Sequence, residues 1–261
     1  MRAIVLSSYP LVDRFAHKER VLRDLCDRGI ETYLLYAGTA PADYVREARR
    51  RRPLLELRGR LSMAGRSQRG PSEGGPRARK LAHVARDLGI RVVEVRALGD
   101  AECLRTVSTF HPDVLFNLSA LYVPKVFLDA ADHRVVGGHY ADLPRLRGTD
   151  TVRWTILLDH PMVVSHQVLT AEFDMGDIVR RTPVEVRRGD DIATIRRRCR
   201  TAAAEGCLAV ADALASGELL HERQRREDGT TFFRMGTYLR KRVDEILLLG
   251  RYTHVAPGTP Q

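Results

Sequence analysis

The 261-residue sequence lacks long hydrophobic runs and contains few cysteines, lysines and aromatic residues. Its apolar runs are shorter than the roughly 18 to 20 residues of a membrane-spanning helix, and the opening MRAIVLSSYP turns polar too early for a secretory signal. The four cysteines are widely spaced and form no C-x-x-C pair, which argues against a disulfide framework and a zinc knuckle. These absences predict a cytoplasmic protein with reduced thiols and no membrane contact.

The net charge of +10 comes almost entirely from arginine. Lysine occurs only at positions 18, 80, 125 and 241, so 39 of the 43 basic residues are arginine. A GC-rich coding sequence favours arginine codons, so the charge alone is weak evidence for nucleic-acid binding. No interleaved aromatic residues or RNA-binding signature accompany the arginines. We therefore do not expect a nucleic-acid partner, and a non-catalytic RNA-binding protein that uses its arginine surface is kept as an alternative.

Short apolar strands alternate with amphipathic helices along most of the chain, of which 44% is hydrophobic. Strands are expected over residues 2–7, 31–36, 91–95, 114–118, 134–138, 163–170 and 178–186. Helices are expected over residues 12–29, 79–88, 100–110, 124–130, 149–158 and 191–216, the last one capped by Asp190 or Asp191. This alternation predicts an α/β fold with a Rossmann-like, mostly parallel sheet and helices on both faces.

The chain divides by composition into a main domain and a tail. Residues 1–186 carry the α/β pattern, whereas residues 187–261 contain one long helix and a short C-terminal appendage. Within the first part, residues 49–79 are rich in Gly, Pro, Ser and Arg and have no sustained apolar periodicity. We interpret them as a basic, partly mobile insertion, and a loop that touches an anionic ligand is the alternative.

The first strand-to-helix turn reads SSYPLVD and carries no glycine-rich phosphate motif. A dinucleotide-binding turn needs the G-x-G-x-x-G pattern so that the pyrophosphate can approach the backbone, and NAD and FAD are therefore not expected. The Walker pattern is also absent from the sequence, which argues against a nucleoside triphosphatase.

Residues 135–179 carry the chemistry-bearing pattern. A strand runs into two glycines and His139, and Asp174 follows 35 residues later, with Gly176 close behind. Because ligands of open α/β sheets bind where the carboxyl ends of strands converge, we expect His139 and Asp174 to meet there. A histidine oriented by a carboxylate can donate a proton to an oxyanion or a leaving amine. The alternative is a histidine bound to a turn carbonyl and an aspartate that caps a turn.

The same segment resembles the folate-dependent formyltransferases, which act on glycinamide ribonucleotide, methionyl-tRNA or amino sugars. Their pattern N-x-H-x-S-L-L-P-x-x-x-G, followed by D-x-G, is similar to GGHYADLPRLRG at residues 137–148 and DMG at residues 174–176. The upstream HPDVLFNLSALYVPKVFLDA, at residues 111–130, resembles the strand, folate loop and helix of that family. By this resemblance, residues 1–186 are a formyltransferase-like catalytic domain, with His139 and Asp174 as its catalytic pair.

One position departs from the family pattern, because Gly137 stands where the family has asparagine. That asparagine donates to the formyl oxygen, and losing such a donor costs on the order of 10² to 10³ in rate. Another donor can fill the gap, and Asn117 is our first candidate, ahead of Ser119 and His166. Alternatively, the glycine admits a bulkier ligand for another acyl transfer or a hydrolysis, or the protein binds its ligand without turnover.

The resemblance also implies the binding residues and the substrates. The co-substrate would be 10-formyltetrahydrofolate, and no metal is required. Residues implied in folate binding are Ala120, Leu121, Tyr122 and Val123 in one loop and Ala171, Glu172 and Phe173 in another. Residues assigned to the substrate side are Gly137, Gly138, Arg145 and Arg147, although a surface salt bridge is the alternative role for each arginine.

The acceptor is inferred from the C-terminal region. Methionyl-tRNA formyltransferases carry a barrel domain after the catalytic one, and the roughly 75 residues that follow position 186 leave no room for it. The segment DGTTFFRMGTYLRKRVDE at residues 228–245 is similar to the region that follows the catalytic domain in sugar and tRNA formyltransferases. We therefore expect a small-molecule amine, an amino sugar or a specialised metabolite, as the acceptor. The sequence leaves open whether the protein is a homodimer.

Overall fold

The structure is a computed structural model that describes residues 1–8, 15–38, 80–119 and 121–256. These residues form a seven-stranded sheet whose first five strands in space are parallel, and β7 runs antiparallel to both of its neighbours. In spatial order the strands are β3 (Arg91–Val95), β2 (Glu31–Ala37), β1 (Arg2–Ser8), β4 (Val114–Asn117), β5 (Val135–His139), β7 (Val163–Val168) and β8 (Ile178–Pro183). The predicted mostly parallel sheet is confirmed.

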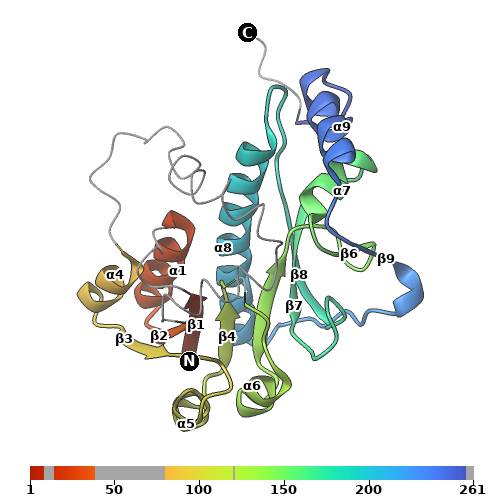
Figure 1. The fold of residues 1–261 in the computed structure, drawn as a ribbon. Helices are drawn as coiled ribbons and strands as arrows, with labels where there is room; N and C mark the ends of the chain where they lie inside the picture. Colours follow the sequence, from red (N-terminus) through yellow and green to blue (C-terminus); the bar gives the residue numbers. More distant parts are fainter. Residues whose placement is uncertain (9–14, 39–79, 120, 257–261) are drawn as a thin grey trace.

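Helices cover both faces of the sheet, as the alternation of elements predicts (Figure 1). One face is covered by α1 (Ala16–Asp27), α4 (Leu81–Asp87) and α8 (Ile192–Ser216), and the other by α5 (Ala101–Phe110) and α6 (Lys125–Ala130). The two helical layers bury separate hydrophobic clusters against opposite sides of the same strands. The α/β fold class is therefore confirmed.

Strand alternation decides which polar residues reach the candidate site. Phe116 and Val136 belong to the cluster beneath α1 and α8, whereas Leu115 and Val135 belong to the cluster beneath α5 and α6. Successive side chains on a strand point to opposite faces. Asn117, Gly137 and His139 therefore lie on the face that α5 and α6 cover.

The long helix α8 is part of the layer over the sheet. Asp191 caps its N-terminus, because the Asp191 carboxylate accepts a hydrogen bond from the Thr194 N–H at 2.7 Å. Its apolar side packs against α1, β7 and β8. The sequence prediction of a capped helix at this place is confirmed, and the domain boundary at residue 186 stays a proposal.

The C-terminal region pairs with the segment after β5 through two three-residue strands, which form a separate two-stranded sheet. Strands β6 (Leu146–Gly148) and β9 (Thr230–Phe232) pair in parallel, α7 (Thr151–Leu157) packs against β6, and α9 (Thr237–Leu248) packs against α7. The sequence analysis did not predict β6 and β9, because three residues are too few to show a strand period, and it did not predict α9. The 3₁₀ helix η1 (Arg226–Asp228) precedes β9.

Three further predictions concern what the chain contains. Cys103, Cys199 and Cys207 are buried and Cys26 is half-buried, and all four thiols are free, as expected. No helix in the described part of the chain is long and apolar enough to cross a membrane. The predicted insertion at residues 49–79 lies outside the described residues.

Candidate active site

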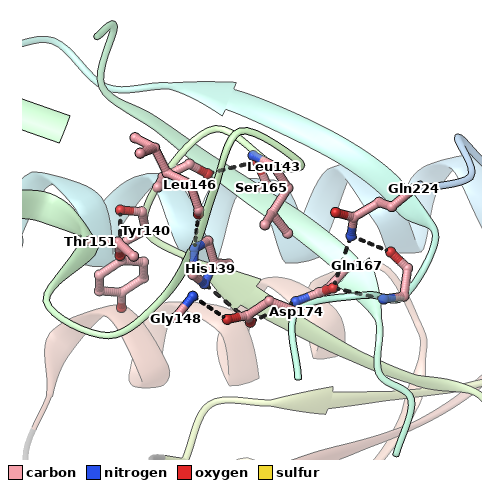
Figure 2. Close-up of polar contacts among 12 residues, drawn as sticks. His139, Tyr140, Leu143, Leu146, Gly148, Thr151, Ser165, Gln167, Asp174 and Gln224 are labelled. Atoms are coloured by element: carbon pink, nitrogen blue, oxygen red, sulfur yellow. Dashed lines mark hydrogen bonds and ion pairs between the residues drawn. The ribbon is translucent and has the colours of Figure 1, made fainter. Parts of the chain in front are cut away.

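His139 and Asp174 face each other at the end of β5 (Figure 2). The His139 Nδ1 lies 3.3 Å from an Asp174 carboxylate oxygen, and the His139 Nε2 lies 2.7 Å from the Leu146 carbonyl oxygen. Both partners can accept a hydrogen bond from a ring nitrogen that carries a proton. The structure thus brings together the pair that the sequence predicts to meet. It also contains the turn carbonyl of the alternative interpretation, so the catalytic role stays a prediction.

The Asp174 carboxylate is held in its ionised form by several donors. One oxygen accepts from the Gly148 N–H at 2.8 Å, and the other accepts from the Gln167 side-chain amide at 3.1 Å. Burial by itself would raise the pKa of Asp174, but the hydrogen bonds from His139, Gly148 and Gln167 outweigh it, and the pKa lies below its usual value. The carboxylate therefore stays charged beside the imidazole.

Two glutamines that the sequence analysis missed connect this carboxylate to the rest of the molecule. Gln167 accepts from the Gly176 N–H at 3.1 Å with the same side chain that donates to Asp174. Gln224 donates to the Gln167 oxygen at 3.3 Å and to the Gly176 carbonyl at 2.6 Å. The available signal was the polar Ser-His-Gln run inside an otherwise apolar strand, which marks buried polar groups that need partners.

Asn117 lies opposite Gly137 in the β4–β5 register and on the same face of the sheet as His139. Its side-chain oxygen accepts from the Ser119 N–H at 3.0 Å and from the Ser119 hydroxyl at 2.7 Å. In the Asn117 amide only the oxygen can accept a hydrogen bond. The two bonds from Ser119 therefore fix the orientation of the amide and leave its NH₂ group directed away from Ser119. Ser119, the second candidate donor, therefore serves as a partner of Asn117.

The space beside Gly137 is filled by a neighbouring leucine. A Cβ atom at Gly137 would lie 2.9 Å from a terminal methyl carbon of Leu169. Real Cβ contacts are longer, so any side chain at position 137 requires Leu169 to move. The expectation that the glycine admits a bulkier ligand at this point is therefore not supported by the packing, because protein already occupies the space.

His166, the third candidate donor, lies on the opposite face of the sheet. Its ring Nε2 contacts the Ala203 carbonyl of α8 at 2.9 Å, and the side chain is fully buried. Burial lowers the pKa of His166 to about 4, the bond to Ala203 opposes the shift, and the Arg180 charge adds to it. The adjacent Gly138 faces this ring. His166 therefore does not lie beside His139 on the candidate-site face, which corrects its assignment as a donor there, whereas the assignment of Gly138 to the substrate side stays a prediction.

The two candidate arginines behave differently. Arg147 is only 2% exposed, and its guanidinium donates to the carbonyls of Arg225, Arg226 and Gly229. Since those bonds hold the guanidinium inside the protein, neither a substrate contact nor a surface salt bridge describes Arg147. Arg145 is exposed and lies 3.8 Å from the Asp142 carboxylate, so its outer surface remains available to a ligand.

The two loops implied in folate binding lie next to each other. The rings of Tyr122 and Phe173 are 5.3 Å apart, and these side chains are 51% and 72% exposed. Val123 is buried and Leu121 is half-buried, and both pack into the cluster beneath α5 and α6. Ala171 and Glu172 are exposed, and the Glu172 carboxylate pairs with Arg226. Ala120 lies outside the described residues.

No cluster of three or more His, Cys, Asp and Glu side chains able to bind a metal ion occurs within the described ranges.

Comparison with known proteins places this arrangement in a family. The sequence profile described as formyl transferase matches residues 67–211, which is more than half of the chain. The chain belongs to the formyl transferase family. This match confirms the resemblance that the motifs around His139 and Asp174 indicate.

Curated relatives in this family are distant in sequence. The methionyl-tRNA formyltransferase of Citrifermentans bemidjiense is 25% identical over 143 residues, which cover 54% of this chain and 45% of the relative. The enzyme of Bacillus subtilis with the same name is 22% identical over 144 residues, covering 54% of this chain and 45% of the relative. The match thus spans less than half the length of these formyl transferase relatives.

Solved structures share the fold over a larger part of the chain. The N-formyltransferase of Helicobacter canadensis, in complex with folinic acid and dTDP-3-aminofucose, has a TM-score of 0.61 and 10% identity, covering 99% of this chain and 85% of that one. Glycinamide ribonucleotide transformylase 1 of Symbiobacterium toebii has a TM-score of 0.58 and 15% identity, covering 86% and 94%. At these identities the likeness shows that the formyl transferase fold is shared.

Proposed function

We propose that this formyl transferase moves a formyl group from 10-formyltetrahydrofolate to a primary amine of a small molecule. The observation that carries the proposal is the contact of 3.3 Å between His139 and Asp174 at the carboxyl end of β5. Ligands of open α/β sheets bind at this end of the strands. The family membership supplies the reaction class, and the paired side chains supply an acid and a base for it.

In the proposed reaction the amine nitrogen attacks the formyl carbon. A bond forms between these two atoms, the bond from the formyl carbon to the donor nitrogen breaks, and the proton lost by the amine ends on that donor nitrogen. His139 stabilises the negative charge that develops on the formyl oxygen, and Asp174 orients the ring and assists the proton transfer. The lowered pKa of Asp174 keeps its carboxylate charged for this role.

Asn117 is our candidate for the second donor to the formyl oxygen. Its side-chain oxygen is occupied by Ser119, so the NH₂ group is the part of the amide left to donate to a ligand. It lies one strand away from Gly137, on the same face as His139. An amide fixed in advance by Ser119 suits an oxyanion donor, because it loses little orientational freedom when the charge forms.

The formyl donor is proposed to bind between residues 121–123 and residues 171–174. The exposed rings of Tyr122 and Phe173 form an apolar surface beside Asp174, which suits the aromatic portions of a folate. Large apolar side chains this exposed are a common mark of a binding surface. Backbone groups of the same loops would provide hydrogen bonds to the pterin.

The acceptor is proposed to be an amino sugar or another small amine. The structural neighbour from Helicobacter canadensis, which was solved with a nucleotide-linked amino sugar, aligns over 99% of this chain. The methionyl-tRNA formyltransferases match it over about half of its length. Exposed Arg145, near the candidate site, can bind an anionic group on such an acceptor.

A second candidate function is folate or metabolite binding without turnover. The observation that favours it is Leu169, which fills the position where the family pattern places its asparagine side chain. If the NH₂ group of Asn117 does not reach the formyl oxygen, the site lacks that donor. Binding would then persist while transfer would not occur.

Mass spectrometry of a reaction that contains 10-formyltetrahydrofolate and pooled amines, including nucleotide-linked amino sugars, tests both candidates. We expect one acceptor to gain a formyl group, and we expect His139→Ala to lower the rate by about 10² to 10⁴ without loss of folding. His133→Ala, at an exposed histidine outside the site, is the matched control and should retain activity. Folate binding with no formylated product would instead support the non-catalytic function.

A further inference from the structure

Residues 222–232, which follow α8, contact the groups that hold His139 and Asp174. Strand β9 pairs with β6, so that Leu146 lies beside Thr230 and Gly148 lies beside Phe232. Leu146 supplies the carbonyl that binds the His139 ring, and Gly148 supplies the N–H that binds Asp174. The pairing of β6 with β9 therefore supports both members of the pair at once. These residues lie beyond the 67–211 range that the family profile matches.

Arg147, between those two residues, fastens the strand to the same segment. Its buried guanidinium donates to the Arg226 carbonyl at 3.0 Å and to the Arg225 carbonyl at 2.7 Å. Gly229 is packed so closely that a Cβ atom there would lie 1.7 Å from the Pro144 carbonyl oxygen. The close packing of Gly229 and the hydrogen bonds of Arg147 restrict the position of residues 225–229 against β6.

Gln224 reaches Asp174 from the other side through one intermediate. Its NH₂ group donates to the Gln167 oxygen at 3.3 Å, and the Gln167 NH₂ group donates to Asp174 at 3.1 Å (Figure 2). A side-chain amide has two distinct ends, and the bonds that the Gln167 oxygen accepts from Gly176 and Gln224 leave its NH₂ end facing the carboxylate. Gln224 thus helps to orient the Gln167 amide so that its NH₂ end faces Asp174.

The segment is anchored at both ends. Glu222 pairs with the Arg181 guanidinium through two bonds of 2.6 and 2.8 Å, and its backbone bridges Ile178 of β8. At the other end, the Phe232 carbonyl accepts from the Thr149 N–H at 2.9 Å. A segment held in this way can keep its inner contacts at constant geometry.

We propose that Gln224, in the segment after α8, and Arg147, which binds that segment, are positioning residues that hold Asp174 and His139 in their reactive orientation. Gln224 acts on Asp174 through Gln167, and Arg147 acts on His139 through the Leu146 carbonyl. This inference rests on the proposed formyl transfer for its kinetic consequence. Its structural part, the orientation of His139 and Asp174, is independent of the substrate.

Gln224→Leu in the full chain is the decisive variant, because it removes both donors and keeps a side chain of similar length. We expect kcat to fall about 10- to 100-fold while KM for 10-formyltetrahydrofolate changes less than about threefold, because misplaced catalytic groups slow chemistry more than binding. The ¹⁵N resonances of the His139 ring, assigned by their loss in His139→Gln, should shift in Gln224→Leu without any substrate present.

Arg223→Ala is the matched control, since Arg223 is the exposed neighbour of Gln224 in the same segment. It should retain the kcat and the His139 resonances of the parent protein. A folded Gln224→Leu variant with unchanged His139 resonances would overturn the proposal. If the parent protein transfers no formyl group, the proposed function fails, yet the resonances still decide whether Gln224 positions the pair.

Discussion

At the scale of single residues, Asp174 combines an unusual backbone with a full set of donors. Its φ of 55° lies in the left-handed region, which aspartate tolerates better than most side chains. Strained residues of this kind concentrate at functional sites, where the surrounding contacts hold them. Here the donors are the Gly148 N–H, the Gln167 amide and the His139 ring. The carboxylate is thus positioned by its neighbours as well as by its own backbone.

Gly137 provides a prediction at the same scale. We expect Gly137→Asn to lower the free energy of unfolding by about 1 to 3 kcal/mol, because the new side chain must displace Leu169. Adding Leu169→Ala should recover part of that loss, since it empties the space that the asparagine needs. Thermal or urea unfolding of both single variants and the double variant gives the coupling free energy.

The same variants test the role of position 137 in transfer. Leu169→Ala removes the side chain that crowds the new asparagine. If this crowding limits transfer, the double variant should transfer formyl groups faster than Gly137→Asn alone. If the effects of Gly137→Asn and Leu169→Ala on the free energy of unfolding are strictly additive, the two side chains do not interact, which would contradict this interpretation.

At the scale of elements, α8 approaches the sheet most closely where it crosses β7. Gly206 faces the His166 ring, and a Cβ atom there would lie 2.0 Å from the ring Cε1. The helix can occupy this position only because residue 206 has no side chain. His166 in turn bonds to the Ala203 carbonyl one helical turn earlier. Helix and strand thus meet around one buried imidazole.

His166 predicts a dependence of stability on pH. Burial lowers its pKa in the folded protein to about 4 from the ordinary 6.5, so below pH 6.5 the unfolded chain binds a proton that the folded chain does not. Stability from this group is therefore complete above pH 6.5 and is lost as the pH falls toward 4. We expect about 2 kcal/mol less stability at pH 5 than at pH 7 from His166.

Urea unfolding of the parent protein and of His166→Gln at both pH values measures this contribution. The half-buried His17, whose pKa is lowered to about 3 by burial and by the charges of Lys18 and Arg200, contributes a similar loss in both proteins and cancels in the comparison. His133→Gln, at an exposed site, serves as the control. An equal loss of stability in the parent protein and in His166→Gln would rule out the assignment.

At the scale of the whole molecule, several arginines in the described part of the chain form ion pairs that join elements. Arg28 pairs with Asp212 at 2.7 Å between α1 and α8, and Arg181 pairs with Glu222 at 2.6 Å. Exposed pairs contribute little to stability. They do, however, engage guanidinium groups that a phosphate backbone would otherwise bind. A net charge of +10 therefore does not by itself indicate a nucleic-acid-binding surface.

This distribution predicts weak, nonspecific binding of tRNA. Any complex seen at about 50 mM salt should be lost at about 200 mM, because phosphate contacts weaken steeply as counterions are added. Gel-shift measurements at the two salt concentrations provide the test, with a DNA duplex of similar charge as the control. A tRNA-specific complex that survives the higher salt would contradict a small-molecule acceptor.

The sequence by itself determined the α/β pattern, the family resemblance and the pairing of His139 with Asp174, because period, spacing and motif are properties of contiguous residues. The three-residue strands β6 and β9 and the glutamines beside Asp174 could not be predicted in the same way. Their partners lie far away in the chain and carry no motif. Contacts of this kind come into being only when distant segments pack.

Only the tertiary structure decided what each polar side chain does. Arg147 and His166 are charged or titratable residues near the candidate site, yet the buried Arg147 binds backbone carbonyls and His166 lies on the far face beneath α8. Strand alternation and helix packing assign these places, and both depend on the register between elements. Local sequence therefore predicts which groups are present, while the packing of the folded chain selects which of them face the ligand.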